Sequence, residues 1–159
     1  MALDQRDKEL VAIGASIGAL CRPCVDHHVA AGREAGLGEA ELARAVQVAQ
    51  ATQRIAQGLL FTHADELVNV AVPSTGVSTD APSGSRPDEL IRLGASVAAN
   101  CHPLLEQHIA GCLVQGVDPS LVRSAIKMAK IVQHNAAEIT ARKAAAAIEL
   151  IEAVPSTIS

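Results

Sequence analysis

The sequence predicts an all-α protein in which two tandem helical repeats pack as one helical bundle domain. Its hydrophobic share is 49%, yet it contains one Phe and no Trp or Tyr. A core of such small aliphatic side chains favours packed helices over a sheet. No useful stretch shows the alternation of period two that a half-buried strand would have. The third observation is an internal repeat with an offset of 80 residues.

The repeat covers nearly the whole chain and needs no gap around its cysteines. Its best-matched stretch contains the identical pairs Glu9/Glu89, Leu10/Leu90, Gly14/Gly94, Ala15/Ala95, Ser16/Ser96, Ala19/Ala99, Cys21/Cys101, Pro23/Pro103, His28/His108 and Ala30/Ala110. We assign residues 1–75 to the first repeat, 76–87 to a linker and 88–159 to the second repeat. The wider segment 73–87 is rich in Ser, Thr, Gly and Pro, a composition typical of linkers.

The first helix is expected over about residues 4–20. Its apolar side chains recur at spacings of three and four, at Leu10, Ile13, Ile17 and Leu20. Gly14 and Gly18 each lower helix propensity by roughly 1 kcal/mol relative to Ala, so we expect a close helix contact there. A second helix should begin near Pro23 and end near Gly36, because proline suits the first turn and glycine the position after the last.

The remaining helices are expected from similar signals. A third helix should cover about residues 39–57, with more helix towards residue 70. In the second repeat, Asp118 is a helix cap and Pro119 a first helical residue. Residues 135–153 then form a long Ala-rich helix.

Charge and composition argue against two classes of partner. The net charge is −4, whereas nucleic-acid binding needs clustered Lys and Arg and exposed aromatic platforms. The early apolar run at residues 10–20 is far shorter than the roughly 20 residues that span a bilayer. The charged N-terminus lacks the order of regions found in a signal peptide. We therefore expect a cytoplasmic protein that binds neither nucleic acid nor membrane.

Two of the four cysteines, Cys21 and Cys24, lie three residues apart. In a reducing compartment such a pair is more often catalytic or metal-binding than a structural disulfide. With Pro23 in the first helical turn, both thiols lie at a helix N-terminus, where unpaired N–H groups stabilise a thiolate. His28 shares a helical face with Cys24 and can take a proton from a thiol and return it. Glu9, on the preceding helix, can hold the imidazole or pass protons on.

The pattern of Glu9, Cys21, Cys24 and His28 resembles the alkylhydroperoxidase (AhpD-like) and carboxymuconolactone decarboxylase family. The spacing from Glu9 to Cys21 matches the alkylhydroperoxidase branch, and the resemblance extends over both halves. It implies an all-helical fold. For a chain with two repeats it also implies a homotrimer, which forms a pseudo-hexamer.

By this resemblance Cys24 is the thiolate that attacks a peroxide, and Cys21 is the resolving thiol that closes a disulfide with it. His28 and Glu9 form the proton relay. The implied activity is that of a thiol-dependent peroxidase or disulfide reductase. No cofactor is expected, because the chain lacks a flavin or nicotinamide motif such as G-x-G-x-x-G. Reduction of the disulfide then needs an external dithiol donor, which in the family can be a lipoyl-bearing protein.

The second repeat departs from this pattern. It keeps Glu89, Cys101 and His108 but has Leu104 where the second cysteine should stand. By the resemblance the missing residue is the attacking thiol, and Cys112 is too far along the chain to replace it. We expect a mainly structural copy, with Glu89, Cys101 and His108 as a second candidate site.

Other interpretations stay open. Cys21 and Cys24 can be small buried core residues, although this leaves their Glu, Pro and His companions unexplained. With His28 and Glu9 they can form a four-ligand zinc set, but the first repeat has no second Cys-x-x-Cys, and we predict no bound metal. The chain can also be a decarboxylase-like or isomerase-like relative without thiol chemistry. A non-catalytic or metal-binding oligomeric helical module is the last alternative.

Overall fold

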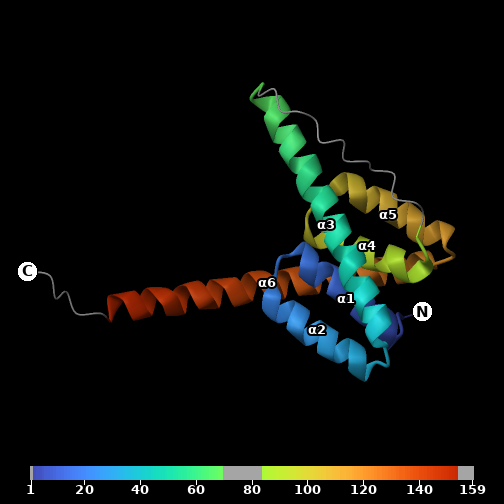
Figure 1. The fold of residues 1–159 in the computed structure, drawn as a ribbon, viewed down its shortest axis with the longest axis horizontal. Helices are drawn as coiled ribbons and strands as arrows, with labels where there is room; N and C mark the ends of the chain where they lie inside the picture. Colours follow the sequence, from blue (N-terminus) through green and yellow to red (C-terminus); the bar gives the residue numbers. More distant parts are fainter. Residues whose placement is uncertain (1, 70–83, 154–159) are drawn as a thin grey trace, which may run out of the picture.

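The structure is a computed structural model that describes residues 2–69 and 84–153. It places six α-helices in these residues (Figure 1): α1 (Gln5–Gly18), α2 (Arg22–Glu34), α3 (Glu39–Leu67), α4 (Arg86–Ala98), α5 (His102–Val114) and α6 (Pro119–Glu152). The described residues contain no strand, which confirms the predicted all-α class. None of these helices has the length and apolarity needed to cross a membrane.

The helices start where the sequence signals place them. Cys21 is the N-cap of α2, and Pro23 lies in its first turn. Asp118 caps α6 by accepting a hydrogen bond from the Ser120 N–H at 2.7 Å, and Pro119 opens that helix. Both predicted starts are confirmed. Proline suits each first turn because it has no N–H to leave unpaired there.

Helix α1 ends two residues earlier than expected, through a left-handed turn at Leu20 (φ 55°). The Cys21 N–H donates to the Ser16 carbonyl at 2.9 Å, and the Leu20 N–H donates to Ile17 at 3.0 Å. This is the Schellman pattern that closes a helix, and its left-handed position is usually glycine. A leucine there gives no stop signal in the sequence. Helix α2 uses the usual residue, since Gly36 (φ 84°) takes the equivalent position.

The two long helices are continuous. Helix α3 runs to Leu67 rather than stopping near residue 57, and the helix expected over residues 135–153 is the second half of α6. Neither proline nor glycine interrupts residues 120–152, so nothing breaks α6 after its capped start.

The predicted boundary between the repeats falls at the edge of the described residues. Positions 76–83 of the expected linker lie outside them. Ser85 caps α4, and Arg86 and Pro87 form its first turn. The last two positions of the expected linker therefore belong to a helix.

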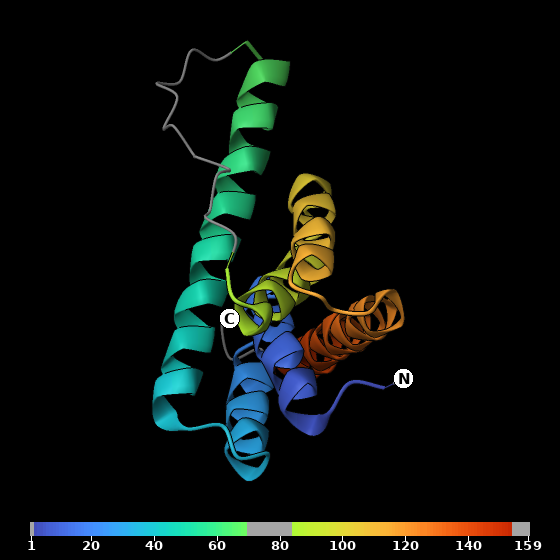
Figure 2. The ribbon, with the colours of Figure 1, turned by 90° about the vertical axis from the view of Figure 1, so that its right-hand side faces the viewer.

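Helices α1 and α4 pack together between the two long helices (Figure 2). A methyl group on Gly14 would collide with the Ile91 carbonyl, and one on Gly94 would collide with the Val11 carbonyl. Gly18 also lies against the backbone of α4. The close helix contact expected at Gly14 and Gly18 is confirmed, and glycine is needed there because no side chain fits.

Each long helix packs on the other half of the chain. Helix α3 contacts α4 as well as α1, and α6 contacts α1 as well as α4. Two ion pairs also join the halves: Arg44 Nη2 lies 2.5 Å from Asp88 Oδ2, and Arg86 Nη2 lies 2.5 Å from Asp7 Oδ2. Both acids are buried. The two halves therefore pack against each other, and each of the two hydrophobic clusters contains residues from both halves.

Two helix ends extend away from this core (Figure 1). Residues 141–153, which we call the arm, are exposed along their whole length. Residues 57–69 of α3 are also largely exposed. Both segments lie on long helices whose first halves are anchored in the bundle.

Candidate functional site

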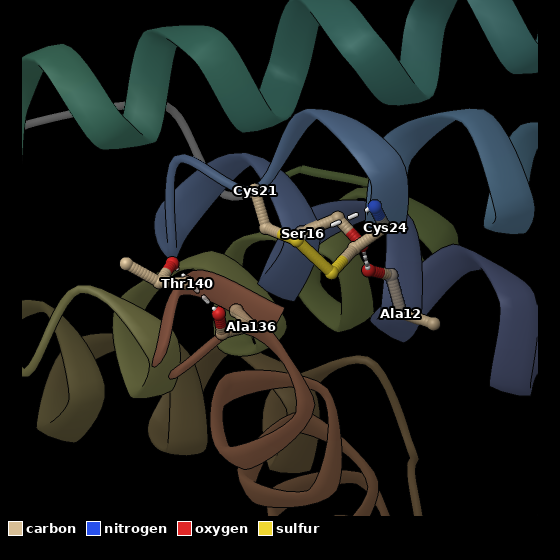
Figure 3. The surroundings of a disulfide bond; sticks show 6 residues. All are labelled: Ala12, Ser16, Cys21, Cys24, Ala136 and Thr140. Atoms are coloured by element: carbon tan, nitrogen blue, oxygen red, sulfur yellow. Dashed lines mark hydrogen bonds between the residues drawn. A yellow bond between two sulfur atoms is a disulfide. The ribbon is translucent and has the colours of Figure 1, made fainter. Parts of the chain in front are cut away.

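Cys21 and Cys24 form a disulfide at the N-terminus of α2 (Figure 3). Their Cα atoms lie 5.3 Å apart, and the Cys24 N–H donates to Cys21 Sγ at 3.3 Å. The turn that ends α1 fixes this position, because Cys21 is both the last residue of that turn and the cap of α2. Both side chains are buried, so the sulfur atoms are shielded from bulk water.

Glu9 and His28 form a hydrogen-bonded pair between α1 and α2. His28 Nδ1 lies 2.9 Å from Glu9 Oε2, and Gln5 Nε2 donates to the other Glu9 oxygen at 2.7 Å. Glu9 is 4% exposed. A carboxylate partner keeps the imidazole proton on Nδ1, which leaves Nε2 for proton exchange. His28 is four residues after Cys24 and therefore on the same face of α2.

Helix α6 comes from the other half of the chain and lies beside the disulfide (Figure 3). Ala136 belongs to the same hydrophobic cluster as the two cysteines, and Thr140 Oγ1 donates back to the Ala136 carbonyl at 3.0 Å. On α1, Ser16 Oγ donates to the Ala12 carbonyl at 2.7 Å. Both hydroxyls are thus bonded to their own helices, and the disulfide has a largely apolar surrounding.

These parts suit reversible thiol oxidation. When the disulfide is reduced, the N–H groups and dipole of the first turn of α2 stabilise a thiolate. The Glu9–His28 pair supplies a proton acceptor on the same helix face. A second thiol within bonding distance protects an oxidised cysteine from further oxidation, because it converts a sulfenic acid to a disulfide.

The second half contains a similar acid–imidazole pair. His108 Nδ1 lies 3.0 Å from Glu89 Oε2. The other Glu89 oxygen accepts from Arg92 at 2.7 Å and from the Gly84 N–H at 3.0 Å. Burial acts to raise the pKa of Glu89, but the hydrogen bonds from His108, Gly84 and Arg92 outweigh it and lower that pKa. Glu89 is therefore ionised and holds the His108 proton on Nδ1.

The thiols of the second half are not paired. Cys101 is the N-cap residue of α5, as Cys21 is of α2, but its side chain accepts no cap hydrogen bond. Leu104 is a fully buried core residue at 1% exposure. Cys101 and Cys112 carry free thiols. Burial and the nearby Glu89 charge raise the pKa of Cys112 to about 12, so this thiol stays protonated and inert.

A cavity of about 260 Å³ opens against the second acid–imidazole pair. The residues that line it include Ile55, Arg92, Leu104, Gln107 and His108. Arg92 stands where the first half has Ala12, so the two halves differ in charge as well as in thiol content. The sequence interpretation missed Arg92, although its place three residues after Glu89 is an ordinary spacing for a helical ion pair.

Other residues near the first site were also missed. Gln5 precedes Glu9 by four residues, a spacing that predicts contact on a helix. Ala136 and Thr140 approach the disulfide only because α6 crosses from the other half, and no local pattern predicts that crossing.

The structure also bears on the metal-binding alternative. The zinc set needs Cys21 and Cys24 as ligands, and their sulfur atoms are bonded to each other. In the described part of the chain, no three His, Cys, Asp or Glu side chains group so that they could hold a metal ion. His27, next to the site residue His28, is exposed, and its ring centroid lies 4.8 Å from that of His28.

Comparison with known proteins places the first half in a family context. Residues 1–63 match the model of the carboxymuconolactone decarboxylase family. The matched segment contains Glu9, Cys21, Cys24 and His28, so the resemblance inferred from these residues is confirmed over this part of the chain. No curated protein and no solved structure matches the chain.

Proposed function

We propose that the first half of the chain is a thiol-dependent peroxidase or disulfide reductase of the alkylhydroperoxidase type. The observation that carries this proposal is the Cys21–Cys24 disulfide at the N-terminus of α2, with the Glu9–His28 pair beside it on that helix. The family match over residues 1–63 supports an enzyme of this group. The paired thiols favour peroxide chemistry over the family's decarboxylation.

In the proposed cycle, His28 Nε2 accepts the proton of the Cys24 thiol. The thiolate attacks one oxygen of a hydroperoxide and the O–O bond breaks, so Cys24 becomes a sulfenic acid. The departing alkoxide takes a proton from the His28 imidazolium and leaves as an alcohol. Glu9 stabilises the imidazolium between these two transfers, since it holds the opposite ring nitrogen.

Cys21 then attacks the Cys24 sulfenic acid, the disulfide forms and water leaves. The hydrogen bond from the Cys24 N–H supports a thiolate on Cys21 for this step. An external dithiol reduces the disulfide by thiol–disulfide exchange and becomes a disulfide itself. A lipoyl-bearing protein is our candidate donor. The same exchange with a small-molecule disulfide would give the reductase activity.

Substitution of each thiol tests the proposal. Cys24→Ser should abolish peroxide consumption in the presence of a dithiol, because a serine hydroxyl does not form the attacking thiolate. Cys21→Ser should consume peroxide once and leave Cys24 as a sulfenic or higher acid, detected by mass spectrometry. Cys101→Ser is the matched control and should keep the wild-type rate. Peroxide consumption that survives Cys24→Ser would refute the proposal.

The proton relay is tested separately. His28→Gln should lower the peroxidase rate by roughly 10²-fold or more, the usual contribution of a general base. His108→Gln, the equivalent change in the second half, should leave that rate unchanged. Equal losses in the two variants would argue for a shared structural role of the histidines.

A second candidate function is proton transfer on a lactone or β-keto acid without thiol chemistry. It is favoured by the cavity beside His108, where an ionised Glu89 orients the imidazole and no paired thiol is present. Such turnover should survive alkylation of the cysteines and disappear in His108→Gln. The peroxidase should show the opposite response to both treatments.

A further inference from the structure

The arm exposes an apolar stripe that has nothing to pack against within the described chain. Ala141, Ala144, Ile148 and Ile151 recur at spacings of three and four and so share one helix face. Ile148 is 55% exposed and Ile151 is 72% exposed. A helix segment of this length gains little stability in water by itself, and in proteins most helical stability comes from packing of an apolar face.

A groove of about 900 Å³ elsewhere on the molecule has a matching character. It lies between the outer part of α3, the end of α1 and the turn from α4 to α5. Small residues form part of its lining: Gly18, Ala56, Ala98 and Ala99. Leu20, Leu60 and Phe61 add large apolar side chains, and these three are 72%, 63% and 62% exposed. Such a concentration of exposed apolar side chains marks an interaction site.

The arm and the groove agree in length. The helical part of the arm, residues 141–152, is about 18 Å long at 1.5 Å per residue. The groove follows α3 from Gln53 to His63, which is about 17 Å at the same rise. A narrow helix of alanines with two isoleucines on one face suits a groove partly lined by glycine and alanine.

The arm does not reach the groove of its own chain. Figure 1 shows the arm leaving the bundle along the long axis of the molecule, while the outer part of α3 leaves in a different direction. Within the described chain α6 packs mainly on α1, α4 and α5, so none of its main packing contacts folds the end of α6 back onto α3. A second copy of the chain has a groove free to take it.

We propose that the arm of one copy docks in this groove of the next copy. The contact joins two different surfaces, so each chain both donates an arm and accepts one. A contact of this kind closes into a ring when the rotation between copies allows it, and the expected homotrimer would be such a ring. The docked arm would also cover Cys101, which lies in the groove wall, so the neighbouring copy would complete the surroundings of the second-half thiol.

Two double variants separate the donor from the acceptor surface. Ile148→Glu with Ile151→Glu blocks the arm, and Leu60→Glu with Phe61→Glu blocks the groove. All four positions are exposed in the isolated chain, so circular dichroism should show wild-type helix content. Leu113→Glu with Val114→Glu, at the exposed end of α5, is the matched control. Light scattering should give a trimer for the wild type and the control, and a monomer for each blocked variant.

Mixing the two blocked variants is the decisive measurement. Each retains the surface that the other lacks, so the mixture should form a heterodimer and stop there, because only one arm–groove contact is intact. A monomeric wild type, or a blocked variant that keeps the wild-type mass, would overturn the proposal. A mixture that stays monomeric would also overturn the proposal. Contacts between two arms or between two grooves would give no recovery of association when the two blocked variants are mixed.

Alkylation of Cys101 gives an independent readout. The arm-blocked variant should react about tenfold faster or more than the wild type, because removal of the arm restores access to the thiol. The α5 control should react at the wild-type rate. Equal Cys101 rates in the arm-blocked variant and the wild type would place the arm outside this groove.

Discussion

Leu104 and Cys24 occupy matching places, three residues after the cap of their helix. Around Leu104 the other parts of a thiol site are present. Cys101 is the N-cap residue of α5, and His108 is hydrogen-bonded to the ionised Glu89. One side chain therefore separates a half that can form a disulfide from a half that cannot.

Restoring the cysteine tests this view. Leu104→Cys should form a second disulfide with Cys101 on oxidation, because the backbone at the start of α5 matches that of α2, with φ −92° and ψ 94° at Cys101 against −97° and 94° at Cys21. The oxidised wild type has two free thiols, Cys101 and Cys112, and the oxidised variant should have one in a thiol assay. Loss of the buried leucine should cost roughly 1–3 kcal/mol of unfolding free energy.

The matched control is Leu105→Cys, which places a thiol one residue further along the helix. It should remain unpaired and give three free thiols. The same count for Leu104→Cys would show that the start of α5 does not hold its residues in a disulfide geometry.

At the residue scale the sequence alone could identify the principal candidates. Cys21, Cys24 and His28 follow one another within two helical turns, so local spacing brings them together. Glu9 was proposed as a partner of the imidazole from its place on the preceding helix, and the structure places it 2.9 Å from His28. The ion pair between Arg44 and Asp88 could not be predicted, because it joins positions 44 residues apart.

The other helices are arranged around the packing contact between α1 and α4. Gly14→Ala should destabilise the protein by about 1–3 kcal/mol, because the new methyl group meets backbone that has no room to move. Gly32→Ala is the matched control, since the nearest atoms to its methyl group would be side-chain ends, those of Leu42, Leu37 and Ile13, and not backbone. The gain in helix propensity, roughly 1 kcal/mol, should then offset most of the cost.

Urea unfolding measured on both variants checks this difference. A Gly14→Ala protein as stable as the wild type would mean that α1 and α4 shift apart without cost. In that case the glycine would not be required by the crossing.

At the element scale, helix starts were easier to predict than helix ends. Caps and prolines such as Asp118 and Pro119 are local signals. The predicted starts of α2 and α6, which such residues mark, are both confirmed. The end of α1 was missed because Leu20 adopts the left-handed conformation usually reserved for glycine. The continuity of α6 was also missed, although residues 120–152 contain no helix breaker.

The whole molecule is held together by contacts between its halves, and some of these depend on pH. Burial acts to raise the pKa of Asp88, but hydrogen bonds from Arg44 and Ser85 lower it overall. The stabilisation from this carboxylate is fully present above the ordinary Asp pKa of about 3.9 and is lost as the pH falls through the lower native value. Acid should therefore weaken the contact between α3 and α4.

Replacing the arginine should reduce this pH dependence. Arg44→Ala should lower stability at neutral pH. Its difference in stability from the wild type should narrow below about pH 4, where Asp88 begins to protonate in the unfolded chain, and close as the pH falls through the lower native pKa. Thermal unfolding from pH 7 to pH 2 measures both effects. Arg54→Ala, an exposed arginine on the same helix, should follow the wild-type curve. A difference between Arg44→Ala and the wild type that stays constant with pH would assign the contact to packing.

The reciprocal glycine contact limits how the two halves can change during evolution. Gly14 needs space beside Ile91, and Gly94 needs space beside Val11, so a larger residue in either half strains the other. The thiol positions carry no such mutual constraint, since Leu104 fills its place in the core without a partner cysteine. Natural variants should therefore lose one reactive cysteine more readily than either glycine.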